Sequence, residues 1–429
     1  MLADKENLLI SAPGKVILFG EHSVVHGKTA IAAALGLRNY LFLQKRQDDV
    51  IEISFPDIGL DRTWKLTDLP GPLPYCPDEA THPLDMHKDL KQALTKLIDC
   101  DEATELAKEQ ATLAFLYLYI CLVDLKKWPH GLTICTRSML PVGAGLGSSA
   151  AFAVCLAAAL LLHFGHIGNH SPYGDKSFEG FTDVELDLIN RWSYQAEQVI
   201  HGNPSGVDNA VSAYGGAKMY TKPSGFQTLQ GFTSLRFLLT NTKVPRSTKA
   251  LVGGVGARLT TYPEVMKPIL DAMQGVSNKC VDMFQQLRNG ELTTSQVTEQ
   301  LQDLIDFNQN LLTAIGVSHP SLDTICRITR KFNLKTKLTG AGGGGCAVTL
   351  LRDDTTEETV DAIISELAAL GYDCFEMSIG GPGAGVASLA DPRNEPLRIN
   401  SISEMQMVSK DELESVAGWK YHRPDGNHV

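Results

Sequence analysis

The sequence predicts a two-domain protein of the α+β class. A chain of 429 residues is too long to be buried around one hydrophobic core. The hydrophobic pattern also changes near residue 235, where short alternating elements give way to long helices. Beyond them a strand, a helix and a second strand follow closely, and such a β–α–β return is typical of α+β domains. We therefore predict domains over residues 1–234 and 235–395, and a polar tail over 396–429.

In the first domain, short apolar runs bounded by turn residues predict strands. The segment Ala12-Pro-Gly-Lys15 separates the first two runs, and His26-Gly-Lys28 marks a turn. The mostly apolar residues 90–123 predict helix in two or more pieces. Strands are expected at residues 8–10, 16–19, 41–43, 50–53 and 132–136.

Residues 182–200 are predicted to form one helix. Apolar side chains recur there at helical spacing, and Gly202 and Pro204 end the pattern. Glu197 lies off the apolar stripe, whereas Glu185 falls inside it and weakens the pattern in the first turns. A further helix is expected to start at about Ser205.

The second domain is expected to open with a strand over residues 232–240. Its long helices are predicted at 263–284 and 294–315. The β–α–β return consists of a strand at 346–351, a helix at 357–370 and a strand at 372–378. The tail is polar from about residue 391, and we expect its end, HRPDGNHV, to be mobile.

The composition is that of an ordinary globular protein and excludes several classes. The net charge is −11 without a long basic run, which argues against nucleic acid as a partner. No two of the nine cysteines form a C-x-x-C pair, so neither a zinc site nor a redox pair is indicated, and a reducing, cytoplasmic location is expected. The apolar residues 150–164 are shorter than the roughly 20 that cross a membrane, and no secretory leader is recognisable.

Residues 141–151, PVGAGLGSSAA, indicate an anion site. Glycines let backbone approach a ligand closely, and the first N–H groups of a helix point outward without partners. The helix dipole adds partial positive charge at the same place. The alternative is a tight turn with a serine cap, in which Ser148 and Ser149 only cap the helix rather than bind Mg²⁺.

A second segment, APGKVILFGEHSVVHG at residues 12–27, carries two candidate ligands. Lys15 follows a Pro-Gly break at the start of a strand, where its ammonium group could bind an anion in a cleft. The alternative is a solvated surface lysine. His22 could contact a ligand, or it could be a buried histidine satisfied by its neighbours.

A third segment, EQVIHGNPSGVD at residues 197–208, adds two acidic groups. Glu197 comes late in its helix, where the dipole disfavours negative charge, and this favours a cation partner. Asp208 follows Ser205 at capping-box spacing, so it could serve the helix start. Its chemical alternative is a base that accepts a proton from an alcohol.

Two nucleotide motifs match only superficially. Residues 340–345 fit G-x-G-x-x-G, but that pattern requires a following helix, and CAVTLL predicts a strand. The segment Gly27-Lys-Thr29 resembles the end of a P-loop, yet His22 stands where the leading glycine is required. We reject both motifs.

Together the three segments resemble the GHMP kinase superfamily, and within it the mevalonate kinases. The three segments match that family's motifs in order, with LTGAGGGGC at residues 338–346 as the last, and VPRST at 244–248 adds a further match. The resemblance covers about residues 11–381. It implies an N-terminal ribosomal-S5-domain-2-like α/β domain that binds ATP and substrate. A ferredoxin-like C-terminal α+β domain and an active site in the cleft complete the implied fold.

The resemblance also implies roles for individual residues. Asp208 would be the catalytic aspartate and Lys15 the lysine beside it, while Ser149 and Glu197 would bind Mg²⁺. His22 and Thr248 would lie on the substrate side. The expected phosphate loop is Gly143, Ala144, Gly145, Leu146, Gly147, Ser148 and Ser149, and the last glycine motif includes Gly340, Ala341, Gly342 and Gly343.

The implied activity is ATP-dependent phosphorylation of the primary hydroxyl of mevalonate, in isoprenoid and sterol precursor synthesis, by a cytoplasmic homodimer. Asp57 departs from the family, because an Asn is expected near the nucleotide base and a carboxylate lacks its amide donor. A GHMP kinase acting on another alcohol is the nearest alternative function. A nucleotide sensor without catalysis is disfavoured, because Asp208, Glu197, Ser149 and Lys15 are all present. An NAD oxidoreductase rests only on the rejected glycine pattern.

Overall fold

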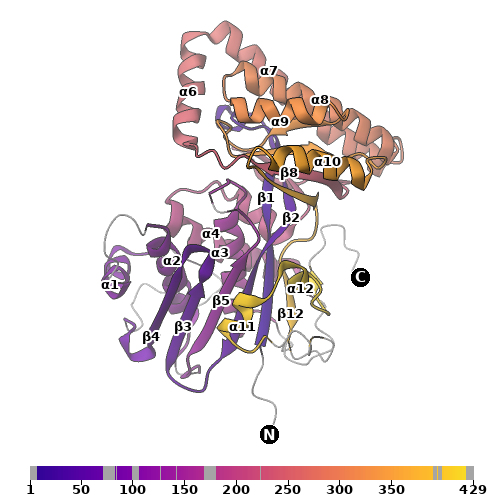
Figure 1. Cartoon of the computed structure of the whole chain (residues 1–429). Helices are drawn as coiled ribbons and strands as arrows, with labels where there is room; N and C mark the ends of the chain where they lie inside the picture. Colours follow the sequence, from indigo (N-terminus) through magenta and orange to yellow (C-terminus); the bar gives the residue numbers. More distant parts are fainter. Residues whose placement is uncertain are drawn as a thin grey trace.

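The chain forms two bodies joined by a pair of long strands (Figure 1). The computed structural model describes residues 7–70, 83, 85–98, 106–125, 127–141, 143–168, 180–222, 224–389, 394 and 399–421. The expected mobile segment 422–429 lies outside these residues. Within them, no helix combines the length and the apolar character that a membrane crossing demands.

The lower body in Figure 1 is built on a mixed sheet. The long strand β2 pairs with β1 along most of its length, and with β5 and β6 at opposite ends of its other edge. The strands are β1 (Asn7–Phe19), β2 (Ala30–Lys45), β3 (Val50–Phe55), β4 (Leu60–Lys65), β5 (Leu132–Ser138), β6 (Ala217–Thr221) and β7 (Gly225–Thr228).

The expected break between two short strands at residues 12–15 is wrong, because β1 continues through it. The pairing with β2 shifts register between Pro13 and Lys15, so the Pro-Gly pair forms an irregularity instead of a turn. A Cβ atom on Gly14 would lie 2.6 Å from the Leu146 carbonyl oxygen. Glycine at this position therefore lets β1 lie directly against the expected phosphate loop.

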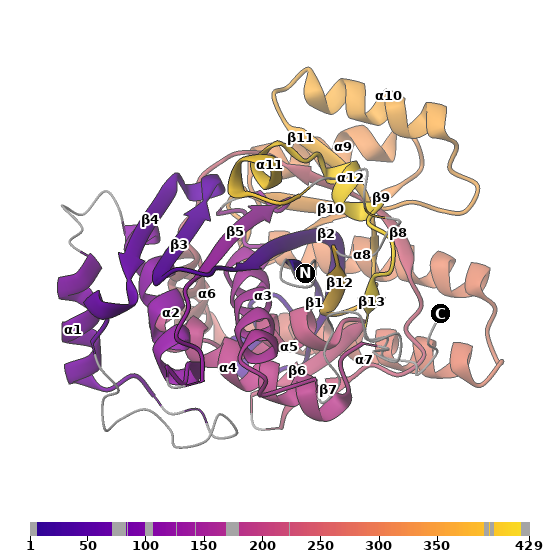
Figure 2. The same ribbon diagram turned by 90° about the horizontal axis from the view of Figure 1, so that it is seen from below.

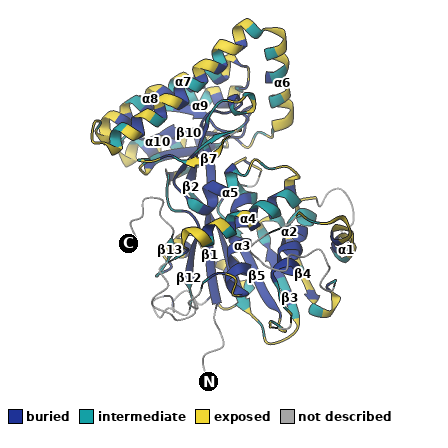
Figure 3. Ribbon diagram, turned by 180° about the vertical axis from the view of Figure 1, so that it is seen from behind, coloured by how far each residue is buried: buried dark blue, intermediate teal, exposed yellow. Residues whose placement is uncertain are grey.

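Helices cover one face of this sheet (Figure 3). The helix α3 is buried on nearly all sides, which explains why its sequence shows apolar residues without a polar face. Thr182 and Glu185 form a capping box at the start of α4, so Glu185 serves the helix end and not the core. The helices are α1 (Lys88–Ile98), α2 (Leu106–Leu122), α3 (Ser148–His163), α4 (Asp183–His201) and α5 (Val207–Tyr214).

After the second body, the chain returns to the first sheet. The strand β12 (Gly385–Ser388) pairs with β1, and β13 (Lys420–Tyr421) pairs with β12. Figure 2 shows the sheet between α3 and α4 on one side and α11 (Ile402–Met407) and α12 (Lys410–Glu414) on the other. The Arg137 guanidinium donates to the carbonyl oxygens of Met405 and Val408 at 3.1 and 3.2 Å. The domain boundaries that we predict from the sequence at residues 234 and 395 stay predictions.

The second body is a four-stranded antiparallel sheet covered by helices, in the order β11-β8-β10-β9. The expected β–α–β return is present, with its two strands on either side of β8. Helix α6 was not predicted, because it buries only Val255 and shows no apolar stripe. The elements are β8 (Leu235–Asn241), α6 (Thr248–Thr261), α7 (Pro263–Arg288), α8 (Thr294–Ala314), α9 (Pro320–Arg330), β9 (Lys335–Leu338), β10 (Cys346–Leu350), α10 (Glu357–Ala368) and β11 (Asp373–Ile379).

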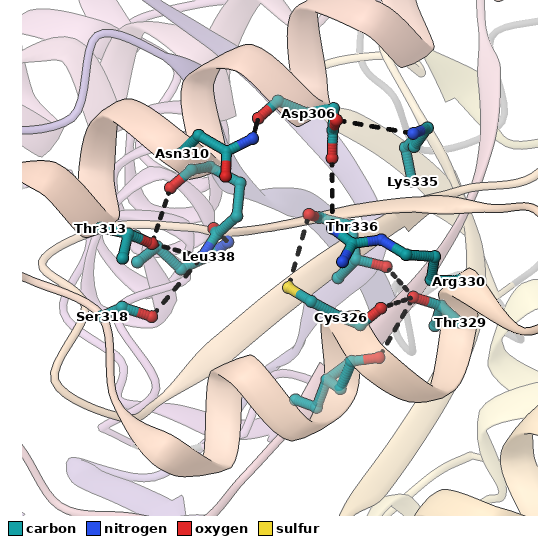
Figure 4. Close-up of polar contacts among 12 residues, drawn as sticks. Asp306, Asn310, Thr313, Ser318, Cys326, Thr329, Arg330, Lys335, Thr336 and Leu338 are labelled. Atoms are coloured by element: carbon teal, nitrogen blue, oxygen red, sulfur yellow. Dashed lines mark hydrogen bonds and ion pairs between the residues drawn. The ribbon is translucent and has the colours of Figure 1, made fainter.

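Polar contacts hold β9 against α8 and α9 (Figure 4). The Asp306 carboxylate lies 3.5 Å from Lys335 Nζ and 3.6 Å from an Arg330 nitrogen. On the buried side, the Thr336 hydroxyl lies 2.7 Å from the Thr329 hydroxyl. Because β9 leads into the last glycine motif, these contacts fix where that motif begins.

A buried ion pair joins the two bodies. Glu21, two residues after the end of β1, and Lys337, on β9, form a salt bridge and are both fully buried. The Asn308 amide donates to the second Glu21 oxygen at 3.1 Å, and Lys337 Nζ also donates to the Leu338 carbonyl at 2.7 Å. Such a pair is costly to break from one side, so it fixes the first segment against the second body.

Burial of His163 predicts a specific loss of stability in acid. Burial near the end of α3 lowers the pKa of His163 to about 4, against 6.5 in the unfolded chain. As the pH falls, the unfolded chain therefore binds a proton on this histidine before the folded protein does. The free energy of unfolding is at its full value, as far as His163 is concerned, above pH 6.5 and decreases as the pH falls toward 4. Between pH 7 and pH 5 we expect a loss of about 2 kcal/mol in the free energy of unfolding from this residue.

Urea unfolding followed by tryptophan fluorescence at both pH values measures this loss. Trp128 lies against His163, with ring centroids 5.2 Å apart, and reports on the region. His163→Leu should depend less steeply on pH than the wild type, whereas the exposed control His130→Leu should keep the wild-type slope. Equal slopes for wild type and His163→Leu would show that this histidine does not carry the acid sensitivity.

Candidate active site

A cavity of about 460 Å³ lies over the start of α3. Residues from β1, β5, α2, α4 and α5 form its walls, together with the glycine loop before α3. Apolar side chains, among them Phe55, Ile58 and Phe152, line one part of it. The polar residues of the lining that matter below are Lys15, Asp57, Ser138, Ser148, Ser149, His201 and Asp208.

Lys15 and Asp208 meet in this cavity. Lys15 Nζ lies 3.3 Å from Asp208 Oδ2 and donates to the Gly145 carbonyl oxygen at 3.2 Å. The lysine side chain is nearly buried, while the aspartate side chain is 37% exposed and reachable from the cavity. The alternative of a solvated surface lysine is therefore wrong.

The start of α5 leaves the Asp208 carboxylate available for chemistry. The residue before the helix is Gly206, in a left-handed conformation with φ of 78°, and it has no side chain with which to cap this end. Ser205 Oγ only accepts a weak bond from Val207 N at 3.4 Å. The capping-box alternative is therefore not what the structure shows, and Asp208 instead pairs with Lys15.

The glycine loop has the geometry of an anion cradle. Gly143, Gly145 and Gly147 all have positive φ, at 72°, 74° and 74°. Helix α3 starts at Ser148 directly after Gly147, and this glycine has no side chain with which to cap the helix. The first N–H groups of a helix have no partner within the helix, so those of α3 can bind an anion here, and the helix dipole favours one.

Arg246 connects this loop to the last glycine motif. Its guanidinium donates to the Ala144 carbonyl at 2.6 Å and to the Gly344 carbonyl at 3.4 Å. A Cβ atom on Gly145 would lie 2.2 Å from Arg246 Nη2, and one on Gly345 would lie 1.1 Å from Nη1. Sequence reasoning did not single out Arg246, although it lies in the VPRST segment. Gly145 and Gly345, which leave room for its guanidinium, are the sequence signal that could have identified it.

The last glycine motif lies between β9 and β10, which supports rejecting the dinucleotide pattern. Gly343 N donates to the Val317 carbonyl at 2.8 Å, and a Cβ on Gly342 would meet the same oxygen at 2.1 Å. A Cβ on Gly340 would lie 3.5 Å from Arg246. Of the described residues, those lining the cavity do not include 340–343, so this motif supports the site from outside.

The two expected substrate-side residues lie in different surroundings. His22 is buried with φ of 59°, and its Nε2 lies 2.8 Å from the Ala341 carbonyl oxygen. Burial lowers the pKa of His22, and its Nδ1 has no partner among the described atoms. Thr248 is exposed at the first residue of α6 and does not line the cavity.

Ser149 and Glu197 converge beside Asp208. Ser149 Oγ lies 3.1 Å from His201 Nε2, and Glu197 Oε2 lies 3.9 Å from the same nitrogen. Glu197 is 3% exposed, and burial raises its pKa to about 7. Its Oε1 atom has no partner among the described residues. Sequence reasoning did not single out His201, although it follows Glu197 by one helical turn.

This donor set fits magnesium. A hydroxyl and one carboxylate with an unpartnered oxygen are oxygen ligands, and Mg²⁺ takes few protein ligands because it keeps several waters and binds phosphate oxygens. The described residues contain no group of three or more His, Cys, Asp or Glu side chains arranged for a metal. A magnesium ion held by these two residues would therefore take its remaining ligands from water or a bound molecule.

Asp57, which stands where the family resemblance leads us to expect an Asn near the nucleotide base, lies in the cavity wall. Its Oδ2 accepts a hydrogen bond from Ser138 N at 2.7 Å, and burial raises the pKa of this carboxyl. The Ser138 hydroxyl lies 3.4 Å from the Ser148 hydroxyl. Asp57 therefore shapes the wall next to the glycine loop.

Two family models match the chain. Residues 115–216 match the GHMP kinases N terminal domain, and residues 291–373 match GHMP kinases C terminal. A mevalonate kinase from Homo sapiens is 45% identical over 389 residues, covering 89% of this chain and 96% of that protein. A mevalonate kinase from Dictyostelium discoideum is 38% identical over 402 residues, covering 90% and 98%.

Solved structures share the fold. The L. major mevalonate kinase in complex with R-mevalonate aligns with a TM-score of 0.63 at 23% identity, covering 89% of this chain and 98% of that one. The Methanococcus jannaschii mevalonate kinase aligns with a TM-score of 0.62 at 22% identity, covering 87% and 98%. The expected two-domain fold is confirmed.

The contact between Gly145 and Arg246 predicts unequal effects of two alanine substitutions. Gly143 and Gly145 have nearly the same φ, but a Cβ on Gly143 meets nothing within 4 Å. Both variants thus carry similar backbone strain, and only Gly145→Ala pushes the guanidinium out of the loop. We expect Gly145→Ala to weaken binding of a non-hydrolysable ATP analogue at least about tenfold more than Gly143→Ala, roughly 1.4 kcal/mol.

Isothermal titration calorimetry of both full-length variants measures this difference. Equal dissociation constants would show that Arg246 does not shape the cradle.

Proposed function

The chain belongs to the mevalonate kinase family of the GHMP kinases, and we propose that it transfers the γ-phosphoryl group of ATP to the primary (C5) hydroxyl of mevalonate. The product is 5-phosphomevalonate, an intermediate of isoprenoid and sterol precursor synthesis. The observation that carries the proposal is the Lys15–Asp208 pair beside an uncapped, glycine-lined helix start. A base, a cation and an anion cradle in one cavity are the groups that phosphorylation of an alcohol requires.

In the proposed reaction, the N–H groups of the glycine loop hold the ATP phosphates. Asp208 orients the hydroxyl of mevalonate and takes its proton as the oxygen bonds to the γ-phosphorus. The bond from that phosphorus to the β–γ bridging oxygen breaks. The bridging oxygen keeps the electron pair and leaves, negatively charged, as part of ADP.

Lys15 acts on the charge in this step. Its ammonium lies 3.3 Å from the Asp208 carboxylate, which favours the ionised base, and it lies near the loop where the phosphates bind. Its second bond, to the Gly145 carbonyl, keeps the ammonium at the edge of the cradle. This positioning supplies charge stabilisation without reorganisation during transfer.

Ser149 and Glu197 are the residues proposed to hold Mg²⁺. When bound, the ion neutralises negative charge on the ATP phosphates. The unpartnered Glu197 oxygen supports this assignment. His22 and Thr248, neither of which lines the cavity, are proposed on the substrate side from the family resemblance. A homodimeric, cytoplasmic enzyme is proposed from the family resemblance.

The direct test is release of ADP from Mg-ATP with mevalonate as acceptor. We expect turnover with mevalonate and little with phosphomevalonate, galactose or homoserine, which tests the nearest alternative within the superfamily. Faster turnover with any of the other alcohols would assign the chain to that substrate. ATP binding without turnover on any alcohol would favour a sensor.

Removing the proposed base should slow the chemical step specifically. We expect Asp208→Ala to lower kcat at least about a hundredfold, because general base catalysis is worth about 10²–10⁴-fold, while ATP binding changes little. The control is Asp354→Ala, which removes an exposed aspartate paired with Arg352 at 2.8 Å on the second body. A near-normal rate for Asp208→Ala would falsify the role of this residue.

Neutralising Glu197 should raise the magnesium requirement. In Glu197→Gln the shape of the side chain is kept but the charge that binds the cation is lost. We expect the Mg²⁺ concentration for half-maximal activity to rise at least about tenfold, because a site with few protein ligands loses much of its affinity when one of them is removed. The measurement is the initial rate against Mg²⁺ at saturating ATP, and an unchanged midpoint would remove Glu197 from the metal site.

A further inference from the structure

A second, smaller cavity adjoins the first. It encloses about 210 Å³, and Ser149, His201 and Asp208 line both cavities. Its walls come from the end of α4 and the start of α5, and they include Glu197 and Asn209. This compartment is therefore the place where the proposed base and the proposed metal ligands meet.

Two buried polar groups in this compartment lack partners. Asn209, next to Asp208 on α5, is 0% exposed, and neither its Oδ1 nor its Nδ2 makes a hydrogen bond with the described residues. Glu197 is 3% exposed, and its Oε1 is also without a partner. Buried polar groups are almost always hydrogen-bonded, so two unpaired groups in one small cavity indicate a ligand.

The donors and acceptors describe that ligand. A divalent cation binds a free carboxylate oxygen such as Glu197 Oε1, and the hydrogens of the waters bound to the ion need acceptors such as Asn209 Oδ1. The Asn209 Nδ2 group is a donor, and it suits an anionic oxygen such as that of a phosphoryl group. An amide between the hydrated cation and the phosphoryl group has a partner for its oxygen and for its nitrogen at once. An apolar ligand would leave Glu197 Oε1, Asn209 Oδ1 and Asn209 Nδ2 without partners.

We propose that Asn209 is a positioning residue of the divalent-cation site, holding waters of the ion through Oδ1 and a phosphate oxygen through Nδ2. The inference rests on the proposed use of a metal–nucleotide substrate. It goes beyond the family resemblance, which assigns this site only to Ser149 and Glu197. A purely structural amide would instead be needed by the metal-free fold.

The test is binding of Mn²⁺ with the non-hydrolysable analogue AMP-PNP to the full chain, followed by electron paramagnetic resonance. Asn209→Leu keeps the approximate volume and removes both polar ends. We expect the Mn²⁺ dissociation constant to rise at least about tenfold, as is usual when an outer-shell partner of a metal is lost. The metal-free melting temperature should stay the same or rise, because no hydrogen bond is lost in that state.

A matched control and a second variant make the result decisive. Asn190 lies on α4 outside this compartment, and its Oδ1 also has no partner among the described residues, so Asn190→Leu should keep the wild-type Mn²⁺ affinity. Asn209→Ala replaces the leucine variant if that variant does not fold. Mn²⁺ affinity within about twofold of wild type would overturn the proposal. Failure of both Asn209 variants to fold without metal would also overturn it, since the amide would then serve the fold.

This experiment is separate from the test of the proposed function. A wild-type chain that binds Mn²⁺ and AMP-PNP but does not phosphorylate mevalonate would contradict the proposed function and leave the role of Asn209 intact. Normal mevalonate phosphorylation by the wild type, together with unchanged Mn²⁺ affinity in the Asn209 variants, would support the proposed function and contradict the role of Asn209.

Discussion

The contact between the Lys15 ammonium and the Asp208 carboxylate is the interaction on which the site depends. Lys15 Nζ lies 3.3 Å from Asp208 Oδ2, and a nearly buried ammonium needs that opposite charge to remain in place. The contact forms only if β1 lies against the glycine loop, and glycines make this possible. A Cβ on Gly14 would lie 2.6 Å from the Leu146 carbonyl oxygen, and one on Gly147 would lie 2.9 Å from Lys15 Cγ. The glycines thus serve the approach of β1 as much as the approach of a ligand.

The second body completes the site from outside the cavity. Arg246 donates to carbonyl oxygens of both glycine loops, and His22 lies 2.8 Å from the Ala341 carbonyl. The buried Glu21–Lys337 ion pair lies next to His22 in the chain and holds the same segment. Three charged side chains and one histidine therefore fix the relative position of three motifs that are far apart in sequence. This arrangement explains how the last glycine motif supports the site without lining the cavity: positive φ values and close carbonyl contacts are what its glycines supply.

Local signals predicted much of the fold and part of the site. The end of α4 at Gly202, the start of α3 at Ser148 and the return β10–α10–β11 follow from spacing, caps and turns, which act within a few residues. The continuity of β1 and the pairing of β12 with β1 depend on register between distant segments, which no local pattern encodes. Arg246 and Asn209 were missed for the same reason. The first matters through two loops distant in sequence, and the second through a cavity that exists only after α4 and α5 pack together.

A double-mutant cycle on Lys15 and Asp208, measured as the single-turnover rate of phosphoryl transfer to mevalonate, tests this account most directly. If the two side chains act as one unit, Lys15→Met combined with Asp208→Asn should be little slower than the slower single variant, because the second substitution removes an interaction that is already lost. If the two losses multiply, the lysine and the aspartate act independently, and the contact at the centre of the site is not what organises the chemistry.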